Sequence, residues 1–291
     1  MIDCHVHLWD PALGFPWIRP GSPHHRAFRI EDLEASAPDT EVSGAILVEG
    51  SRGDAGETLD LRAWRTGRPD LVAGYVGNLH VHGEGGPRRF RELLAELGDT
   101  RPNGMRMGGA RWADCPESAR ALVPELASAG LVLELNLGSG ALRAAAEVAA
   151  RHPELTVVVD HLGNPPNLRL DPGDWIRDLE RAASAPNVVV KVSGLLTQQH
   201  GVPPERIAEL VGRVVDAVGP DRCLIGSDWP ICLPRGSRTG SLELSCLGLG
   251  RLPGDERRRI LHANAVRVYG LGRVRHPSDP LDPIPSTTDR R

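Results

Sequence analysis

The chain begins with Ile2-Asp3-Cys4-His5-Val6-His7, a short run typical of a buried β-strand that ends in two histidines. Side chains alternate across a strand, so His5 and His7 are expected to point the same way and to lie close enough to share a metal ion or a substrate. Similar aliphatic runs recur along the chain and begin near Ser43, Leu71, Asn103, Leu131, Leu155, Asn187 and Arg222. The pattern predicts eight strands.

Longer stretches between these runs carry Leu, Ala and Val at three- and four-residue spacing, which is typical of amphipathic helices. They cover residues 86–97, 116–129, 140–152, 175–184, 204–218 and 255–269. The alternation of strand and helix favours an α/β fold whose parallel sheet closes into a (β/α)8 TIM barrel. An open doubly wound sheet is the alternative, but no glycine-rich phosphate loop follows the first strand.

We expect one domain over residues 1–272, followed by a proline-rich tail at residues 273–291 that is extended or disordered. Residues 11–29 are too long and too rich in proline for a plain connection, so we predict a long lid loop over the barrel mouth after the first strand. Residues 230–251 are expected to form a second loop of this kind after the last strand.

Composition excludes several classes of partner. The formal net charge of −4 argues against binding to nucleic acid or to an anionic membrane surface. No stretch approaches the roughly eighteen apolar residues of a membrane span, and the N-terminus lacks the apolar core of a signal peptide. The 5 cysteines are scattered without metal-site spacing, which favours a reduced, cytoplasmic setting. We expect a small-molecule substrate, and homo-oligomer formation is left open.

Polar residues stand where a TIM barrel places its active site, at the C-terminal ends of the strands. They are His5, His7, Glu49, Arg106, Glu134, Asn136, His161, Lys191, Ser193 and Asp228. So many ionisable groups inside a barrel would be destabilising without a purpose. Lys191 is the only lysine among the 34 lysine and arginine residues, and an ammonium group does not replace a guanidinium freely at a tight site.

Several segments resemble the amidohydrolase superfamily, and within it the amidohydrolase-2 branch that holds sugar-acid lactonases and the pyrone dicarboxylate lactonase. The most specific are Gly226-Ser227-Asp228-Trp229-Pro230, residues 157–165 (VVVDHLGNP) and residues 187–195 (NVVVKVSGL), and the similarity runs to about residue 271. The resemblance implies a distorted TIM barrel with its reaction at the C-terminal mouth. It implies a hydrolase that opens a small lactone or carboxylic ester, of a sugar-acid or anionic kind.

Hydrolysis of such a bond at neutral pH needs an activated water, a polarised carbonyl and a proton donor for the leaving oxygen. We predict that Asp228 is the general base and that His161 hydrogen-bonds the water or the carbonyl oxygen. His5, His7 and Asp228 would supply the three protein ligands usual for one catalytic zinc, or for another single divalent ion. Without a metal, the two imidazoles would hydrogen-bond the carbonyl directly.

The fifth predicted strand departs from the metal-dependent pattern of the superfamily, in which a histidine commonly stands there. It offers Glu134 and Asn136, and the fourth strand offers Arg106, so a two-metal site is not expected and the need for a metal stays open. The departure also argues against the alternative function, a zinc-dependent decarboxylase of the same superfamily. A barrel that binds a ligand without turnover is a further alternative, which the polar ring at the mouth disfavours.

The predicted substrate-binding residues are Arg106, Trp9, Trp229, Glu49 and Glu134. Arg106 and Lys191 are expected to face the pocket as cations, and Lys191 is also a candidate for stabilising a developing oxyanion. For Arg106 the alternative is a plain ion pair with one of the two glutamates. The tryptophans flank the motifs and would form walls that stack on an apolar ring face, although core packing explains them equally well.

Overall fold

A computed structural model describes residues 1–38, 41–170 and 173–272. Eight parallel strands follow one another in chain order: β1 (Ile2–Val6), β2 (Gly44–Val48), β3 (Val72–Asn78), β4 (Gly104–Gly109), β5 (Val132–Leu137), β6 (Val157–Val159), β7 (Val188–Val192) and β8 (Cys223–Ile225). A parallel bridge between Val6 and Trp229 brings the last strand back to the first. The predicted TIM barrel is confirmed, and each strand begins within two residues of its expected start.

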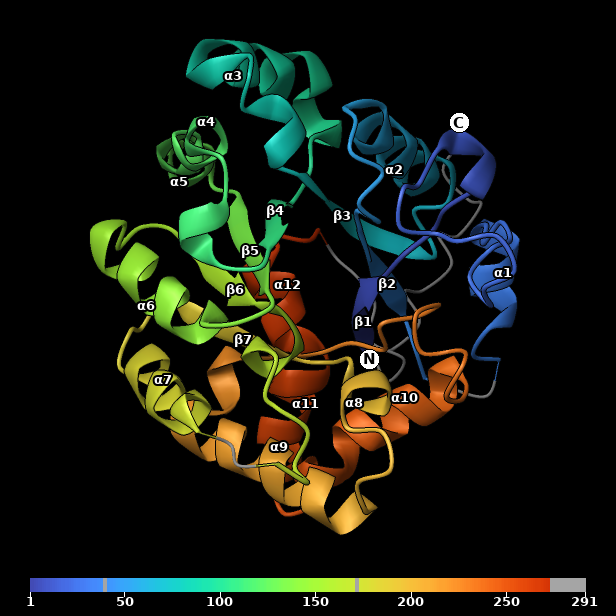
Figure 1. Ribbon diagram of the computed structural model, residues 1–291, viewed down its shortest axis with the longest axis vertical. Coiled ribbons are helices and arrows are strands. Elements are labelled where there is room, and N and C mark those ends of the chain that lie inside the picture. Colours follow the sequence, from blue (N-terminus) through green and yellow to red (C-terminus); the bar gives the residue numbers. More distant parts are fainter. Residues whose placement is uncertain (39–40, 171–172, 273–291) are drawn as a thin grey trace, which may run out of the picture.

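Helices lie between the strands and surround the barrel (Figure 1). They are α1 (Ile30–Ala35), α2 (Gly56–Gly67), α3 (Gly86–Leu97), α4 (Glu117–Arg120), α5 (Val123–Ala129), α6 (Ala141–Arg151), α7 (Asp174–Ala183), α8 (Leu195–Gln198), α9 (Pro204–Val218), α10 (Arg238–Cys246), α11 (Gly254–Arg258) and α12 (Asn264–Val268). The helix predicted over residues 116–129 is divided into α4 and α5, because Pro124 has no backbone N–H and suits only the first turn of a helix.

Residues 230–251 are not simply a loop, as the sequence led us to expect. They contain α10, which begins where the Ser237 hydroxyl accepts a hydrogen bond from the Gly240 N–H at 3.0 Å. Helix α2 was also missed. It buries Glu57 and Thr58 beside Leu61, so its apolar spacing does not reveal it.

Residues 11–29 are held to the end of the barrel by hydrogen bonds of two tryptophans: Trp9, which precedes the segment, and Trp17, which lies in it. The Trp9 indole donates to the carbonyls of His24 and Arg26, both at 3.1 Å, and the Trp17 indole donates to the Gly50 carbonyl at 2.6 Å. The segment therefore reaches the strand ends, while its action as a lid stays a prediction. The predicted tail at residues 273–291 lies outside the described residues.

The N-terminal end of the barrel is closed by apolar side chains. Ile2, Val158 and Leu224 pack in one buried cluster with Val268 and Tyr269 at the end of helix α12. This end holds hydrophobic contacts, and the polar residues gather further along the strands, toward the mouth. No helix within the described ranges is long and apolar enough to cross a membrane.

Candidate active site

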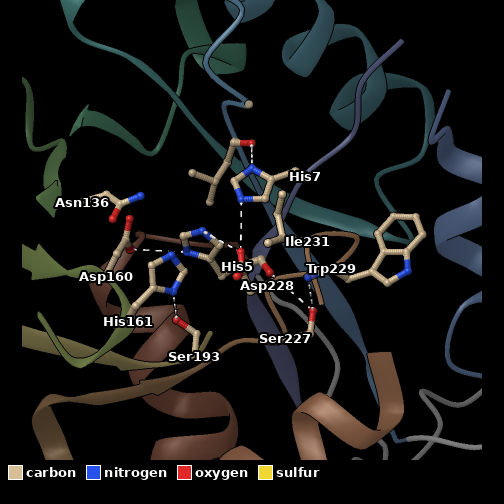
Figure 2. A network of polar contacts seen from close by, with 12 residues as sticks. His5, His7, Asn136, Asp160, His161, Ser193, Ser227, Asp228, Trp229 and Ile231 are labelled. Carbon is tan, nitrogen blue, oxygen red and sulfur yellow. Dashed lines mark hydrogen bonds and ion pairs between the residues drawn. The ribbon is translucent and has the colours of Figure 1, made fainter. Parts of the chain in front are cut away.

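His5 and His7 face each other as the strand alternation predicts, with ring centroids 4.9 Å apart. His7 Nδ1 lies 2.9 Å from the Val48 carbonyl oxygen, which can only accept, so Nδ1 carries the proton and Nε2 keeps a free lone pair. That Nε2 lies 3.5 Å from Asp228 Oδ1. His5 Nε2 lies 3.8 Å from the same oxygen and is buried without a hydrogen bond to any described residue (Figure 2).

Asp228 follows β8 in a strained backbone conformation, with φ of 59°. Its N–H donates to the His5 carbonyl at 2.9 Å, and the preceding Ser227 is held by Asp3, which accepts from the Ser227 N–H at 2.8 Å and from its hydroxyl at 2.6 Å. Burial alone would raise the pKa of Asp228, but His161 and the two β1 histidines outweigh it, and the pKa is about 2. Asp228 is therefore a fixed carboxylate at neutral pH.

His161 lies in the turn Asp160–Gly163 that follows β6, also with a positive φ of 51°. Its Nδ1 is 3.0 Å from the Ser193 hydroxyl, and its ring centroid is 4.5 Å from that of His5. Gly194 makes this approach possible, since a Cβ there would lie 2.7 Å from His161 Nδ1. Burial lowers the pKa of His161, so the imidazole is neutral at physiological pH.

Arg106 is paired rather than free. Its Nε donates to Glu49 Oε1 at 2.6 Å and one terminal nitrogen donates to the Glu49 carbonyl at 2.7 Å, while Asn78 holds the second carboxylate oxygen at 3.0 Å. Burial would lower the pKa of Arg106, but Glu49 keeps it above its usual value. The ion pair considered as an alternative for these residues is present, and both also line the cavity described below.

Lys191 is not at the mouth, and the predicted position is wrong. Its side chain has 0 % exposure, and Nζ lies 2.7 Å from Glu134 Oε2 and 3.1 Å from Asp160 Oδ1. Glu134 is equally buried, and neither residue lines the two cavities described below. Ser193, two residues further along the strand direction, is the group of this segment that reaches His161.

Trp9 and Trp229 are core residues instead of pocket walls, with exposures of 1 % and 2 %. Both rings pack edge-on against Phe28, at centroid distances of 5.1 Å and 5.5 Å. Trp17 and Ile231, which the sequence did not single out, take the wall positions. The sequence pointed to them only indirectly, because Trp17 and Ile231 lie in the two segments that were predicted to cover the barrel mouth.

A cavity of about 350 Å³ opens above the histidines and is lined by His7, Trp17, Gly50, Ser51, Arg106, Asn136, His161, Asp228 and Ile231. An adjoining cavity of about 720 Å³ shares Ser51, Arg106 and Asn136, and adds Glu49, Asn78, His80, Gly108, Gly109, Gly138, Asn164, Pro165 and Gln198. Sequence reasoning missed Asn164 and Gln198, which are linked by a hydrogen bond from Gln198 Nε2 to Asn164 Oδ1 at 2.6 Å. The second cavity is thus rich in neutral carboxamides.

Three donor groups lie close enough together for a single divalent ion, since ligand atoms of His5, His161 and Asp228 are all within 4.8 Å of one another. His5 and His7 each present Nε2 to Asp228 Oδ1 at 3.8 Å and 3.5 Å, too far for a good hydrogen bond. Two ligands on one tetrahedral zinc, each about 2.0–2.1 Å from it, stand roughly 3.3 Å apart. His7 is not part of that group, but its Nε2 also approaches Asp228 Oδ1, so it is a further candidate ligand.

Residues 2–271 match the amidohydrolase family, and the chain belongs to that family. It is 28% identical over 293 residues to L-fucono-1,5-lactonase of Burkholderia multivorans, a match that covers 93% of this chain and 96% of that protein. The L-fucono-1,5-lactonase of Burkholderia ambifaria is also 28% identical, with 94% and 96% covered. A crystal structure of a Burkholderia multivorans amidohydrolase with bound zinc superposes with a TM-score of 0.82 at 27% identity, covering 93% of this chain and 99% of the other.

Proposed function

We propose that this protein hydrolyses a small lactone by attack of an activated water at the cavity floor. The observation that carries the proposal is Asp228, a fixed carboxylate with a pKa of about 2 that lies beside two imidazoles at the bottom of an open cavity. The similarity to two L-fucono-1,5-lactonases supports this reaction class. The cavity beside Asp228 is also lined by His7 and His161, and this supports the proposal.

In the proposed reaction the water oxygen attacks the lactone carbonyl carbon and its proton passes to Asp228. His161 donates from Nε2 to the carbonyl oxygen, with Ser193 donating its hydroxyl proton to Nδ1 and so selecting that tautomer. The ring C–O bond then breaks, and the proton held by Asp228 returns to the leaving oxygen. One carboxylate therefore serves as base and then as acid.

His5, His7 and Asp228 would hold a single zinc or similar divalent ion, and His161 is the alternative third or fourth ligand. Such an ion, when bound, polarises a carbonyl and lowers the pKa of water. The zinc in the Burkholderia multivorans neighbour supports a metal here, although the identity of the ion is part of the proposal.

The lining residues favour a neutral, polyhydroxylated lactone over an anionic one. Arg106 is the cation among them, and Glu49 already neutralises it. The remaining lining groups include Asn136, Asn164 and Gln198, whose carboxamides match hydroxyl groups. A sugar-acid lactone, in which the carboxyl group is closed into the ring, has this chemistry.

The zinc-dependent decarboxylase remains the second enzyme candidate, but strand β5 presents a sealed Glu134 and an uncharged Asn136 instead of a metal-binding histidine. We further propose that residues 1–272 act as one domain in a reduced, cytoplasmic setting. Homo-oligomer formation stays a prediction that size measurement in solution can test.

A panel of sugar 1,5- and 1,4-lactones, followed by acid release, tests the function. We expect hydrolysis of at least one neutral sugar lactone by the wild type and none above background by Asp228→Asn. Metal analysis of the purified protein, and chelation followed by zinc addition, tests the cofactor. Turnover of an aromatic carboxylate to carbon dioxide, with all lactones inert, would overturn the proposal in favour of the decarboxylase.

A further inference from the structure

We infer that Asp160 is a positioning residue that holds the proton of His5 on Nδ1 and leaves the Nε2 lone pair directed at the cavity floor. The inference deepens the proposed function, because it rests on His5 as a ligand of the proposed metal. It concerns a carboxylate that the reaction above does not use and that never meets the substrate.

Asp160 is fully buried, with 0 % exposure. Its Oδ1 is 3.4 Å from His5 Nδ1 and 3.1 Å from Lys191 Nζ. The peptide turns sharply after it, since His161 and Leu162 both have positive φ values, of 51° and 55°. The two neighbouring side chains have different surroundings, since His161 lines the cavity whereas Asp160 is fully buried with its carboxylate beside the His5 ring (Figure 2).

His5 Nδ1 has two competing neighbours. A proton on Nδ1 would be donated to Asp160, and Nε2 would then be free to bind a cation. Lys191 Nζ lies 3.3 Å from the same Nδ1 and could donate to it only if Nδ1 carried no proton. In that tautomer Nε2 would carry the proton and could not coordinate a metal. The choice between these two neighbours therefore decides what His5 can do.

Contacts and charge favour Asp160. The Lys191 ammonium already makes a shorter contact with Glu134, at 2.7 Å, besides its contact with Asp160. Glu134 is satisfied twice, since the Tyr269 hydroxyl also donates to it at 2.6 Å. Neither Asp160 oxygen has a well-formed hydrogen bond within the described residues. A proton on His5 Nδ1 places a donor 3.4 Å from Asp160 Oδ1, a long contact that a small movement would shorten, whereas the other tautomer leaves this buried carboxylate with the Lys191 ion pair alone.

His5, Glu134 and Asp160 form a second group of possible metal ligands, but Lys191 already supplies a cation there. Ligand atoms of His5, Glu134 and Asp160 lie within 4.8 Å of one another, as in a metal site. Lys191 Nζ contacts all three groups, at 3.3 Å, 2.7 Å and 3.1 Å, and so provides the cation from the chain itself. The ammonium holds Asp160 in place, and Asp160 in turn orients His5.

Two measurements test the inference. In ¹⁵N-histidine-labelled protein without metal, with the His5 signals assigned by a His5→Gln variant, we expect His5 to carry its proton on Nδ1. Asp160→Asn should increase the share of the Nε2–H form. A wild-type His5 with its proton on Nε2 would overturn the inference, and this outcome needs no variant that folds.

The second measurement is zinc affinity, by competition with a chromophoric chelator. We expect Asp160→Asn to weaken zinc binding about 10- to 100-fold. Glu134→Gln is the matched control, since it changes an equally buried partner of Lys191 that does not contact His5, and its affinity should change less than threefold. Equal weakening by both variants would mean that buried charge, and not Asp160, sets the affinity. A wild type that binds no zinc would remove the proposed metal, and the tautomer would still be decided by the spectra.

Discussion

Two aspartates approach the imidazole of His5 from opposite sides and have opposite surroundings. Asp228 lies 3.8 Å from Nε2 and belongs to the cavity layer, which we define as His7, His161 and Asp228. Asp160 lies 3.4 Å from Nδ1 and belongs to the sealed layer, defined as Glu134, Asp160, Lys191 and Tyr269. The same residue type thus supplies chemistry where a cavity reaches it and structure where it is closed off.

The electrostatics of the two layers differ accordingly. In the cavity layer Asp228 is a carboxylate beside imidazoles that a substrate or an ion can also approach. In the sealed layer burial would lower the pKa of Lys191, but Asp160 and Glu134 outweigh it and raise the pKa. Changes in the sealed layer should therefore appear first in stability, and changes in the cavity layer first in turnover.

The largest expected effect is on stability. Lys191→Met removes the cation between two buried carboxylates and should lower the free energy of unfolding by about 3–5 kcal/mol. Chemical denaturation measures this change. Lys191→Arg, which keeps the charge, should be destabilised less. If Lys191→Met were as stable as wild type but inactive, Lys191 would have a catalytic role, as the sequence analysis predicted, and not a structural one.

Asp228→Asn should produce the opposite pattern. Loss of the general base is expected to lower turnover at least about a hundredfold, because water is then activated poorly. Binding of a non-hydrolysable lactone analogue and the melting temperature should change far less. A variant that keeps more than a tenth of the wild-type rate would exclude Asp228 as the base.

Ser193→Ala probes the contact between strand β7 and the cavity layer. Removing the hydroxyl that contacts His161 Nδ1 should weaken transition-state stabilisation by about 1 kcal/mol, the value of one hydrogen bond. This corresponds to roughly a fivefold lower kcat/KM. Ser184→Ala, on the outside of the barrel, is a suitable control with the same chemical change. Equal activity of both variants would mean that Ser193 does not orient His161.

The smallest expected effect is that of pH near neutrality. Burial lowers the pKa of His161 and of His5 below the usual value of about 6.5, and that of Asp228 is about 2. His161 and His5 therefore stay neutral and Asp228 stays ionised as the pH falls from 8 to about 6.5. We expect a level kcat/KM over this range and a loss only at more acid pH. A bell-shaped profile centred near neutrality would show that another group titrates in the reaction.

Much of the fold could be predicted from the chain because the signals were local. The aliphatic runs placed all eight strands, and helix α3 has the predicted bounds of residues 86–97. The failures were also local in origin. Helices α2 and α10 bury polar residues such as Glu57 and Arg238, so apolar spacing does not mark them.

By itself the sequence determined which strand ends carry polar groups, because alternation and the order of strands follow from covalent geometry and hydrophobic patterning. It therefore brought His5, His7 and Asp228 to one place correctly. The depth of each group within the barrel depended on the turn after β6 and on packing across the barrel, which involve residues far apart in the chain. Only the tertiary structure could decide that Lys191 is sealed with Glu134 and Asp160, because burial is a property of all the neighbours together.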